Sequence, residues 1–298
     1  MDIKRYLHEK KGIVDSALER YLSGEGKFPK NLHKAIHHSL FAGGKRIRPI
    51  LSIAAFETMG GKGDGILPFA CALEMIHTYS LIHDDLPPID NDDYRRGKPT
   101  CHKVFGEAMA ILAGDALLTE AFHLMTRPLP QDQSLINGWL ILDMVNRIAY
   151  AAGIDGMVGG QVVDIESEGK KGDPSTLQYI HTHKTGALIL ASVQVGAKLG
   201  GASEETLMAF TQYGESVGLA FQIVDDILNV EGEALFLGKN TGSDLSKRKV
   251  TYPSLFGLDE SKRRAKELME LAIDVLNPFG PEADPLREIA RFTIAREY

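Results

Sequence analysis

The chain has 298 residues, a formal net charge of -7, 44% hydrophobic residues and 24% charged residues. This is the composition of an ordinary globular protein, and the acidic balance argues against a nucleic-acid binder, which usually carries a basic face. Its two cysteines, Cys71 and Cys101, form no CxxC motif. They therefore argue against a disulfide scaffold or a zinc site and suit a reducing compartment.

The first residues carry charges throughout and lack the apolar core of a signal peptide. No stretch reaches the ~18 uninterrupted apolar residues of a membrane span. We therefore expect a cytoplasmic protein with no membrane span and no nucleic-acid partner.

Apolar residues recur at intervals of three and four along most of the chain, which predicts helices. Alternating strand patterns with hairpin turns are absent, and only short Gly-, Pro- and Asp-rich stretches separate the helical segments. The sequence thus predicts one all-α domain over residues 1–298. The expected helices lie at 3–22, 31–42, 47–58, 66–86, 104–125, 135–152, 175–199, 204–230 and 260–276.

The stretch LIHDDLPPIDNDDYRRGKPT (81–100) holds five aspartates. Pro87 and Pro88 should end the helix near Asp84 and Asp85, and the following loop can fold back so that Asp90 approaches Asp84. Oxygen ligands indicate a hard cation, and magnesium prefers a few carboxylates together with substrate phosphates. The alternative is a solvated charged loop.

A second acidic pair lies in FQIVDDILN (221–229), where Asp225 and Asn229 share one helical face and Asp226 lies about 100° away. The neighbouring residues are apolar, and buried carboxylates are costly unless they are paired or bind a metal. The alternative is an ion pair with a neighbouring helix.

Cations accompany both sites. GGKRIRP (43–49) presents Lys45, Arg46 and Arg48 after two glycines, where the backbone can approach an anion; alone, it is typical of a solvated basic turn. Arginine binds phosphate with two parallel hydrogen bonds, which explains Arg95 and Arg96 beside the first site. Further cations follow at Lys184, Lys239 and Lys249. Together these residues predict metal-dependent chemistry on a diphosphate, without naming the substrate.

These motifs resemble the short-chain trans-prenyl diphosphate synthases, and among them the bacterial farnesyl diphosphate synthases. The resemblance covers nearly the whole chain in order. It implies an all-α bundle of the isoprenoid synthase type with a deep central cavity, a homodimer, and a transferase that condenses isopentenyl diphosphate with dimethylallyl or geranyl diphosphate. It rests on residues 41–49, 74–107, 156–165, 183–189, 218–230 and 251–258.

The resemblance also implies roles for individual residues. The two aspartate motifs would face each other across the cavity mouth and bind three Mg²⁺ ions, with Mn²⁺ as a substitute, through Asp84, Asp85, Asp90, Asp225 and Asp226. The allylic diphosphate would be held by Arg95, Lys184, Lys239 and Lys249, with Thr185 and Gln222 near the carbocation. Isopentenyl diphosphate would be held by Gly44, Lys45, Arg48, His77 and Arg96.

His77 shares a face with Asp84, and its alternative role is a polar residue satisfied within its helix. Asp92 and Asp93 receive no role beyond shaping the loop or pairing with cations.

In this family, product length depends on bulk just before the first motif, here Tyr79 and Ser80. An aromatic residue at 79 resembles the C15 type, although helical geometry alone places Ser80 more directly below Asp84. The second motif ends in Asn229 where the family has aspartate, which removes one negative charge. We expect normal or reduced activity rather than none.

Four alternatives remain. Within the family these are a C20 (geranylgeranyl) synthase and a weakly active or non-catalytic partner subunit. Outside it, an HD-type phosphohydrolase would use His83 and Asp84 as a metal pair, and a terpene cyclase would need no isopentenyl diphosphate site.

Overall fold

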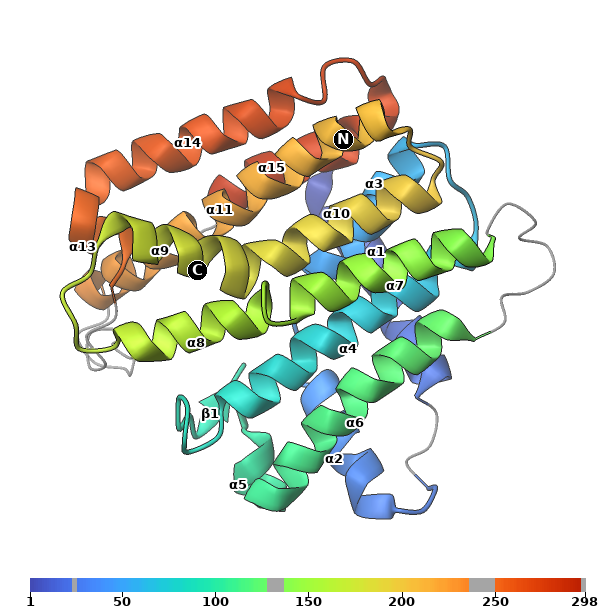
Figure 1. The fold of residues 1–298 in the computed structure, drawn as a ribbon, viewed down its shortest axis with the longest axis vertical. Coiled ribbons are helices and arrows are strands. Elements are labelled where there is room, and N and C mark those ends of the chain that lie inside the picture. Colours follow the sequence, from blue (N-terminus) through green and yellow to red (C-terminus); the bar gives the residue numbers. More distant parts are fainter. Residues whose placement is uncertain (23–25, 128–136, 236–249, 296–298) are drawn as a thin grey trace. The chain divides into compact units, whose positions relative to one another are not determined.

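The computed structural model describes residues 1–22, 26–127, 137–235 and 250–295, without the side chains of 232–235. Helices dominate this part of the chain (Figure 1), which confirms the predicted all-α class. Two compact units divide it, and we describe each by itself. The N-terminal unit comprises Asp2–Ile53 and Lys62–Val145, and the C-terminal unit comprises Met1, Ala54–Gly61 and Asn146–Tyr298. The single domain expected over residues 1–298 stays a prediction.

The N-terminal unit is built around α4, which is buried on nearly all sides and packs along α6. The first helix begins at Asp2, whose carboxylate accepts the Arg5 N–H at 3.1 Å and so caps the helix. The elements are α1 (Ile3–Tyr21), α2 (Lys30–Leu40), the first part of α3 (Ile47–Thr58), the 3₁₀ turn η1 (Asp64–Ile66), α4 (Leu67–Asp84), β1 (Tyr94–Arg95), β2 (Lys98–Pro99), α5 (Cys101–Phe105), α6 (Glu107–Thr126) and the first part of α7 (Gly138–Ala152).

By length and composition alone, the stretches Asp64–Asp84 and Glu107–Thr126 could each cross a membrane. In the first, 78% of the apolar window is buried within the fold, so its apolarity is that of a core helix. In the second only 39% is buried. Helix α6 therefore presents an exposed apolar face.

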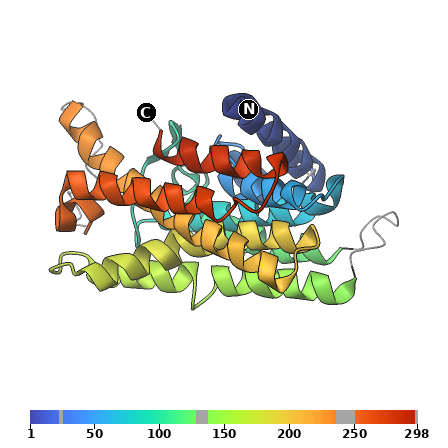
Figure 2. The ribbon, with the colours of Figure 1, turned by 90° about the horizontal axis from the view of Figure 1, so that it is seen from above.

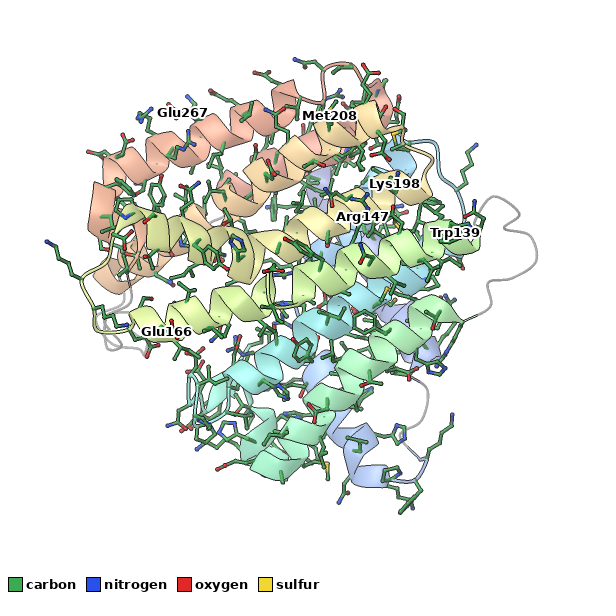
Figure 3. The ribbon with its side chains drawn as sticks, in the orientation of Figure 1. Trp139, Arg147, Glu166, Lys198, Met208 and Glu267 are labelled. Atoms are coloured by element: carbon green, nitrogen blue, oxygen red, sulfur yellow. The ribbon has the colours of Figure 1, made fainter. Side chains whose placement is uncertain are left out.

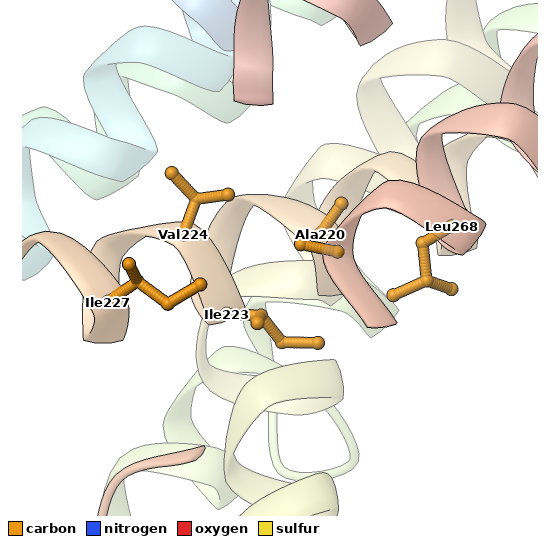
Figure 4. Close-up of a cluster of buried hydrophobic side chains, with 6 residues drawn as sticks. Ala220, Ile223, Val224, Ile227 and Leu268 are labelled. Atoms are coloured by element: carbon orange, nitrogen blue, oxygen red, sulfur yellow. The ribbon is translucent and has the colours of Figure 1, made fainter. Parts of the chain in front are cut away.

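The C-terminal unit centres on α11, which packs against α10 and α14. Figure 4 shows Ala220, Ile223 and Val224 of α11 and Leu268 of α14, which belong to one buried apolar cluster. Within this unit, helix α8 continues nearly in line with the last turns of α7, residues 146–152, after a short turn (Figure 1 and Figure 2). The elements are α8 (Met157–Ser167), α9 (Pro174–Ile180), the π-helical turn η2 (His181–Gly186), α10 (Ala187–Leu199), α11 (Glu204–Leu235), α13 (Tyr252–Phe256), α14 (Leu258–Asp274), η3 (Pro281–Ala283) and α15 (Asp284–Ile294).

Three sequence predictions need correction. The helix expected at 175–199 is three elements, because a π-turn separates α9 from α10. The helix expected at 104–125 is interrupted at Gly106, whose φ of 85° is left-handed. Helices α8, α13 and α15 were not predicted. In α8, Gly159 and Gly160 weaken the helical pattern because glycine is a poor helix former.

Candidate active site

The first aspartate motif lies where α4 ends. The helix stops at Asp84, and Pro87 and Pro88 follow within one turn. The loop then folds back: the Asp90 N–H donates to the Asp84 carbonyl at 2.8 Å, and the Asp92 N–H donates to the carbonyl of the residue after Asp84 at 3.2 Å. The predicted return of the loop toward Asp84 is confirmed.

Asp85 is held by an arginine from the same loop. Arg95 Nε donates to one Asp85 oxygen at 2.7 Å, and Nη2 lies 2.6 Å from the same oxygen. Nη2 also donates to Asp92 at 3.4 Å. Burial raises the pKa of the Asp85 carboxyl, although Arg95 opposes this shift. The ion pair therefore fixes a carboxylate that would otherwise resist ionisation. Asp93 pairs with Lys103 at 2.7 Å, so the two unassigned aspartates do shape the loop through cations.

A tight hairpin directs Arg96 away from Asp85 and toward the turn at Gly43. Strands β1 and β2 are joined by Arg96 and Gly97, whose φ angles of 52° and 75° are typical of a type I′ turn. Arg96 donates to the Gly43 carbonyl. Gly44 has a φ of 129°, a backbone conformation that favours glycine, and a Cβ there would lie 2.5 Å from the Arg96 guanidinium. Two predicted isopentenyl-diphosphate residues are thus brought together across 52 positions of sequence.

The basic motif after Gly44 has a buried member. Arg46 is 3% exposed and donates to Asp15 at 2.8 Å and to Glu74 at 2.7 Å. It is a structural ion-pair centre, because breaking a buried pair leaves an uncompensated charge. By contrast, Lys45 is exposed and Arg48 is partly buried.

His77 lies on α4, two turns before Asp84. Its pKa is held well below the usual value, first by burial and then by the charges of Arg48, Arg96 and Arg95. The imidazole is therefore neutral at physiological pH. Three arginines from two separate segments create a positive potential around it, which suits an anionic ligand.

Tyr79 and Ser80 behave differently. The Tyr79 side chain is nearly buried, and its ring centroid lies 5.6 Å from that of His83 in a T-shaped pair. The Ser80 hydroxyl instead donates to the His77 carbonyl at 2.9 Å. A Cβ on Gly114 of α6 would clash with His83, so the missing side chain makes room for that ring. His83 is packed between α4 and α6, which does not favour the metal pair of an HD-type phosphohydrolase.

In the C-terminal unit the π-turn positions Lys184 and Thr185. π-turns inside helices are frequent at functional sites because they redirect side chains. Lys184 Nζ lies 2.7 Å from Asp164 of α8, which is nearly buried. A Cβ on Gly160 would overlap the Lys184 main chain, so glycine permits the close approach of α8. Sequence reasoning missed Asp164, although it lies in one of the stretches that carry the family resemblance, residues 156–165.

The second aspartate motif lies on α11. The Asp226 carboxylate accepts the Tyr252 N–H at 2.7 Å and lies 3.3 Å from His181 Nε2. This aspartate therefore ties α11 to the start of α13 and to the π-turn. Asp225 and Gln222 are partly buried, and Asn229 is exposed.

The donor set fits magnesium rather than a softer metal. Among the residues that the structure describes, no three acidic, histidine or cysteine side chains form a preformed metal cage. That is compatible with magnesium, which uses few carboxylates and completes its shell with water and substrate phosphates. Lys239 and Lys249 lie outside the described residues.

Comparison with known proteins defines the class. The sequence pattern of the polyprenyl synthetase family matches residues 29–276. This chain belongs to that family, which confirms the predicted resemblance and argues against the hydrolase and cyclase alternatives.

Individual relatives cover the whole chain. It is 48% identical over 299 residues to a farnesyl diphosphate synthase of Geobacillus stearothermophilus, covering 100% of this chain and 99% of the relative. It is 47% identical to a geranylgeranyl diphosphate synthase of Cyanophora paradoxa, covering 98% and 95%. The solved structure of a geranyltransferase from Legionella pneumophila superposes with a TM-score of 0.86 at 33% identity, covering 99% and 98%.

Proposed function

We propose that this protein is a farnesyl diphosphate synthase, which transfers the prenyl group of dimethylallyl or geranyl diphosphate to isopentenyl diphosphate. The observation that carries the proposal is the hairpin at Arg96. It directs Arg95 to the carboxylate of Asp85 and Arg96 to the glycine turn at Gly43 and Gly44. Metal-binding carboxylates and diphosphate-binding cations thereby share one loop.

The residues divide between two substrates. Isopentenyl diphosphate binds where the arginines surround the neutral His77, because a dianionic group relieves the repulsion among those cations. This site comprises Gly44, Lys45, Arg48, His77 and Arg96. The allylic diphosphate is held by Arg95, Lys184, Lys239 and Lys249, with Thr185 and Gln222 beside the carbon that ionises.

Magnesium is the proposed cofactor, three ions per active site, with manganese as a substitute. Its ligands are Asp84, Asp85 and Asp90 of the first motif and Asp225 of the second, with Asp226 assisting. Once bound, it supplies Lewis-acid stabilisation of the diphosphate leaving group. The oxygen-rich donor set, rather than a preformed cage, supports this choice.

The reaction follows from charge. Breaking the allylic C–O bond leaves a carbocation and a diphosphate with increased negative charge, which Lys184 and Arg95 stabilise. Asp164 holds the Lys184 ammonium in place at 2.7 Å. The double bond of isopentenyl diphosphate then attacks the cation to form the new C–C bond. The proton that is lost passes to the released diphosphate, so no protein base is required.

We further propose a soluble, cytoplasmic homodimer without a membrane span. The exposed apolar face of α6 includes Ile111 and Leu112, and α7 exposes Leu142. Trp139 at the start of α7 is also exposed (Figure 3). A contiguous exposed apolar surface is typical of protein interfaces. A second copy of the chain is the partner that the family resemblance favours.

The test is direct. Purified protein is incubated with Mg²⁺, radiolabelled isopentenyl diphosphate and dimethylallyl or geranyl diphosphate, and the products are separated by chain length. We expect a C15 product that disappears with a chelator and in Asp84→Ala. A C20 product would replace the C15 assignment, and absence of elongation with either starter would overturn the proposal.

A further inference from the structure

A cavity of about 530 Å³ lies in the C-terminal unit, outside the residues assigned to either substrate. Its walls come from the end of α7, from α9, the π-turn and α10, and from α11 and α14. Lys184, Thr185, Gln222 and Asp225 do not line it. Its volume lies within the range of small-molecule sites, which is roughly 300–1,000 Å³.

The inner wall of the cavity is apolar. Leu219 of α11 and Leu268 of α14 belong to the buried core between these helices, and Leu271 extends the same wall toward the surface. Such a wall favours a ligand with an apolar body, because burying that body removes hydrocarbon from water.

The charged side chains of the cavity have one sign. Asp155 and Glu215 lie at its exposed rim, and neither arginine nor lysine lines it. Among the described residues, neither acid has a cation within ion-pair distance. The cavity therefore repels diphosphates, which separates it from the substrate sites. Tyr150 adds an aromatic ring, a group that attracts organic cations through its π face.

The cavity is also lined by the π-turn η2, which carries Lys184. Thr182 and His183 line it, and the next residue is Lys184. The His183 ring stacks on Tyr179 at 3.8 Å, and its Nδ1 lies 2.9 Å from the Tyr179 carbonyl. A ligand that presses on His183 therefore acts on the same π-turn that presents Lys184.

From these observations we propose that this cavity is a regulatory site for an organic ammonium ion with an apolar tail. The tail lies against the leucine wall, and the cationic head lies between Tyr150, Asp155 and Glu215. Occupancy changes the position of the π-turn and so the affinity for the allylic diphosphate. The binding half of the proposal is independent of the proposed function, whereas the kinetic half rests on it.

The binding test uses hexyltrimethylammonium as probe, with hexanol and hexanoate as neutral and anionic comparisons, in isothermal titration calorimetry without substrates. We expect saturable binding of one cation per chain. In the double variant Asp155→Asn, Glu215→Gln the affinity should fall at least tenfold. The matched control, Glu205→Gln with Asp274→Asn, removes two carboxylates of the same unit that do not line the cavity and should bind as the unaltered protein does. Binding of hexanol or hexanoate with equal affinity, no saturable binding, or unchanged affinity in the double variant would overturn the site.

The kinetic test measures KM for the allylic diphosphate with and without saturating probe. A change of at least twofold in the unaltered protein, lost in Asp155→Asn, Glu215→Gln, supports coupling through the π-turn. An unchanged KM with the cavity occupied would refute the coupling. Elongation measured without probe keeps a failure of the proposed enzyme activity distinct from either result.

Discussion

The pKa of His77 depends on its burial and on the charges of the arginines around it. Its pKa lies well below its ordinary value because burial and neighbouring arginines disfavour the imidazolium. Below about pH 6.5 the unfolded chain binds a proton at this position that the native protein does not, so stability falls as pH falls through that value.

His77→Gln should therefore weaken the loss of stability on acidification. The measurement compares urea unfolding midpoints at about pH 7.5 and about pH 5.5, on either side of the ordinary histidine pKa. The matched control is His8→Gln, an exposed histidine on α1. Equal acid sensitivity of His77→Gln and the unaltered protein would show that His77 is not the source of the dependence.

Tyr79 is the residue on which product length is predicted to depend. It is 7% exposed and wedged against His83, so its removal opens space along α4. Tyr79→Ala should shift the product from C15 toward C20 or longer, as measured by chromatography of the dephosphorylated products. Ser80→Ala is the control, because the Ser80 hydroxyl is directed to the main chain. An unchanged C15 profile in Tyr79→Ala would show that Tyr79 does not limit product length.

Asn229 leaves a charge deficit at the second motif. Asn229→Asp should lower the Mg²⁺ concentration needed for half-maximal rate, because a third carboxylate strengthens attraction for the cation. The maximal rate should change little if Asn229 acts through water. A large rise in maximal rate would instead show that Asn229 strongly lowers the turnover of the enzyme.

At the scale of elements, the approach of α8 to the π-turn depends on Gly160. Gly160→Ala should push the two apart and displace Lys184 from Asp164. A misplaced catalytic group of this kind costs up to about 100-fold in turnover, and the overpacking costs about 1–3 kcal/mol. Steady-state kinetics and urea unfolding measure the two effects.

Gly12→Ala is the matched control for that variant. Gly12 lies inside α1, and a Cβ there would meet nothing within 4 Å. The substitution should stabilise the protein by about 0.5–1 kcal/mol and leave turnover unchanged, because alanine is the better helix former. If Gly160→Ala behaved in the same way, the close approach would not matter for catalysis.

The spacing of apolar residues was sufficient to predict helices whose bounds are set by their own residues. The helix at 47–58 was predicted with the bounds that it has, and the proline-bounded end of α4 was placed correctly. Periodicity could not reveal the π-turn, since one inserted residue hardly alters apolar spacing. It also missed α8, where glycines serve packing against another element rather than local helix formation.

The same limit applies to the site. The residue types of the first motif were enough to predict a returning loop. Spacing could not distinguish the buried Arg46 from its neighbour Lys45, because burial depends on Asp15 and Glu74 far along the chain. Nor could it show the contact of Asp226 with the Tyr252 amide, which packing of α13 creates.

At the scale of the whole molecule, the proposed homodimer can be tested by placing a charge on the exposed face of α6. If α6 forms a homodimer contact, Leu112→Asp should convert dimer to monomer in sedimentation experiments at micromolar concentration, because a buried unpaired charge is costly. The control is Met208→Asp, a comparably exposed apolar residue on α11 (Figure 3). A monomeric unaltered protein, or a dimer that survives Leu112→Asp, would contradict the proposed interface.

The Arg96–Gly97 turn restricts insertions and deletions in the hairpin formed by β1 and β2. Arg95 ends β1 and Arg96 begins the turn, so a one-residue insertion or deletion in β1 would move both arginines out of the positions from which they reach Asp85 and Gly43. The composition of the loop would be nearly unaltered, but both contacts would be lost. We expect this hairpin to tolerate substitution better than any change in its number of residues.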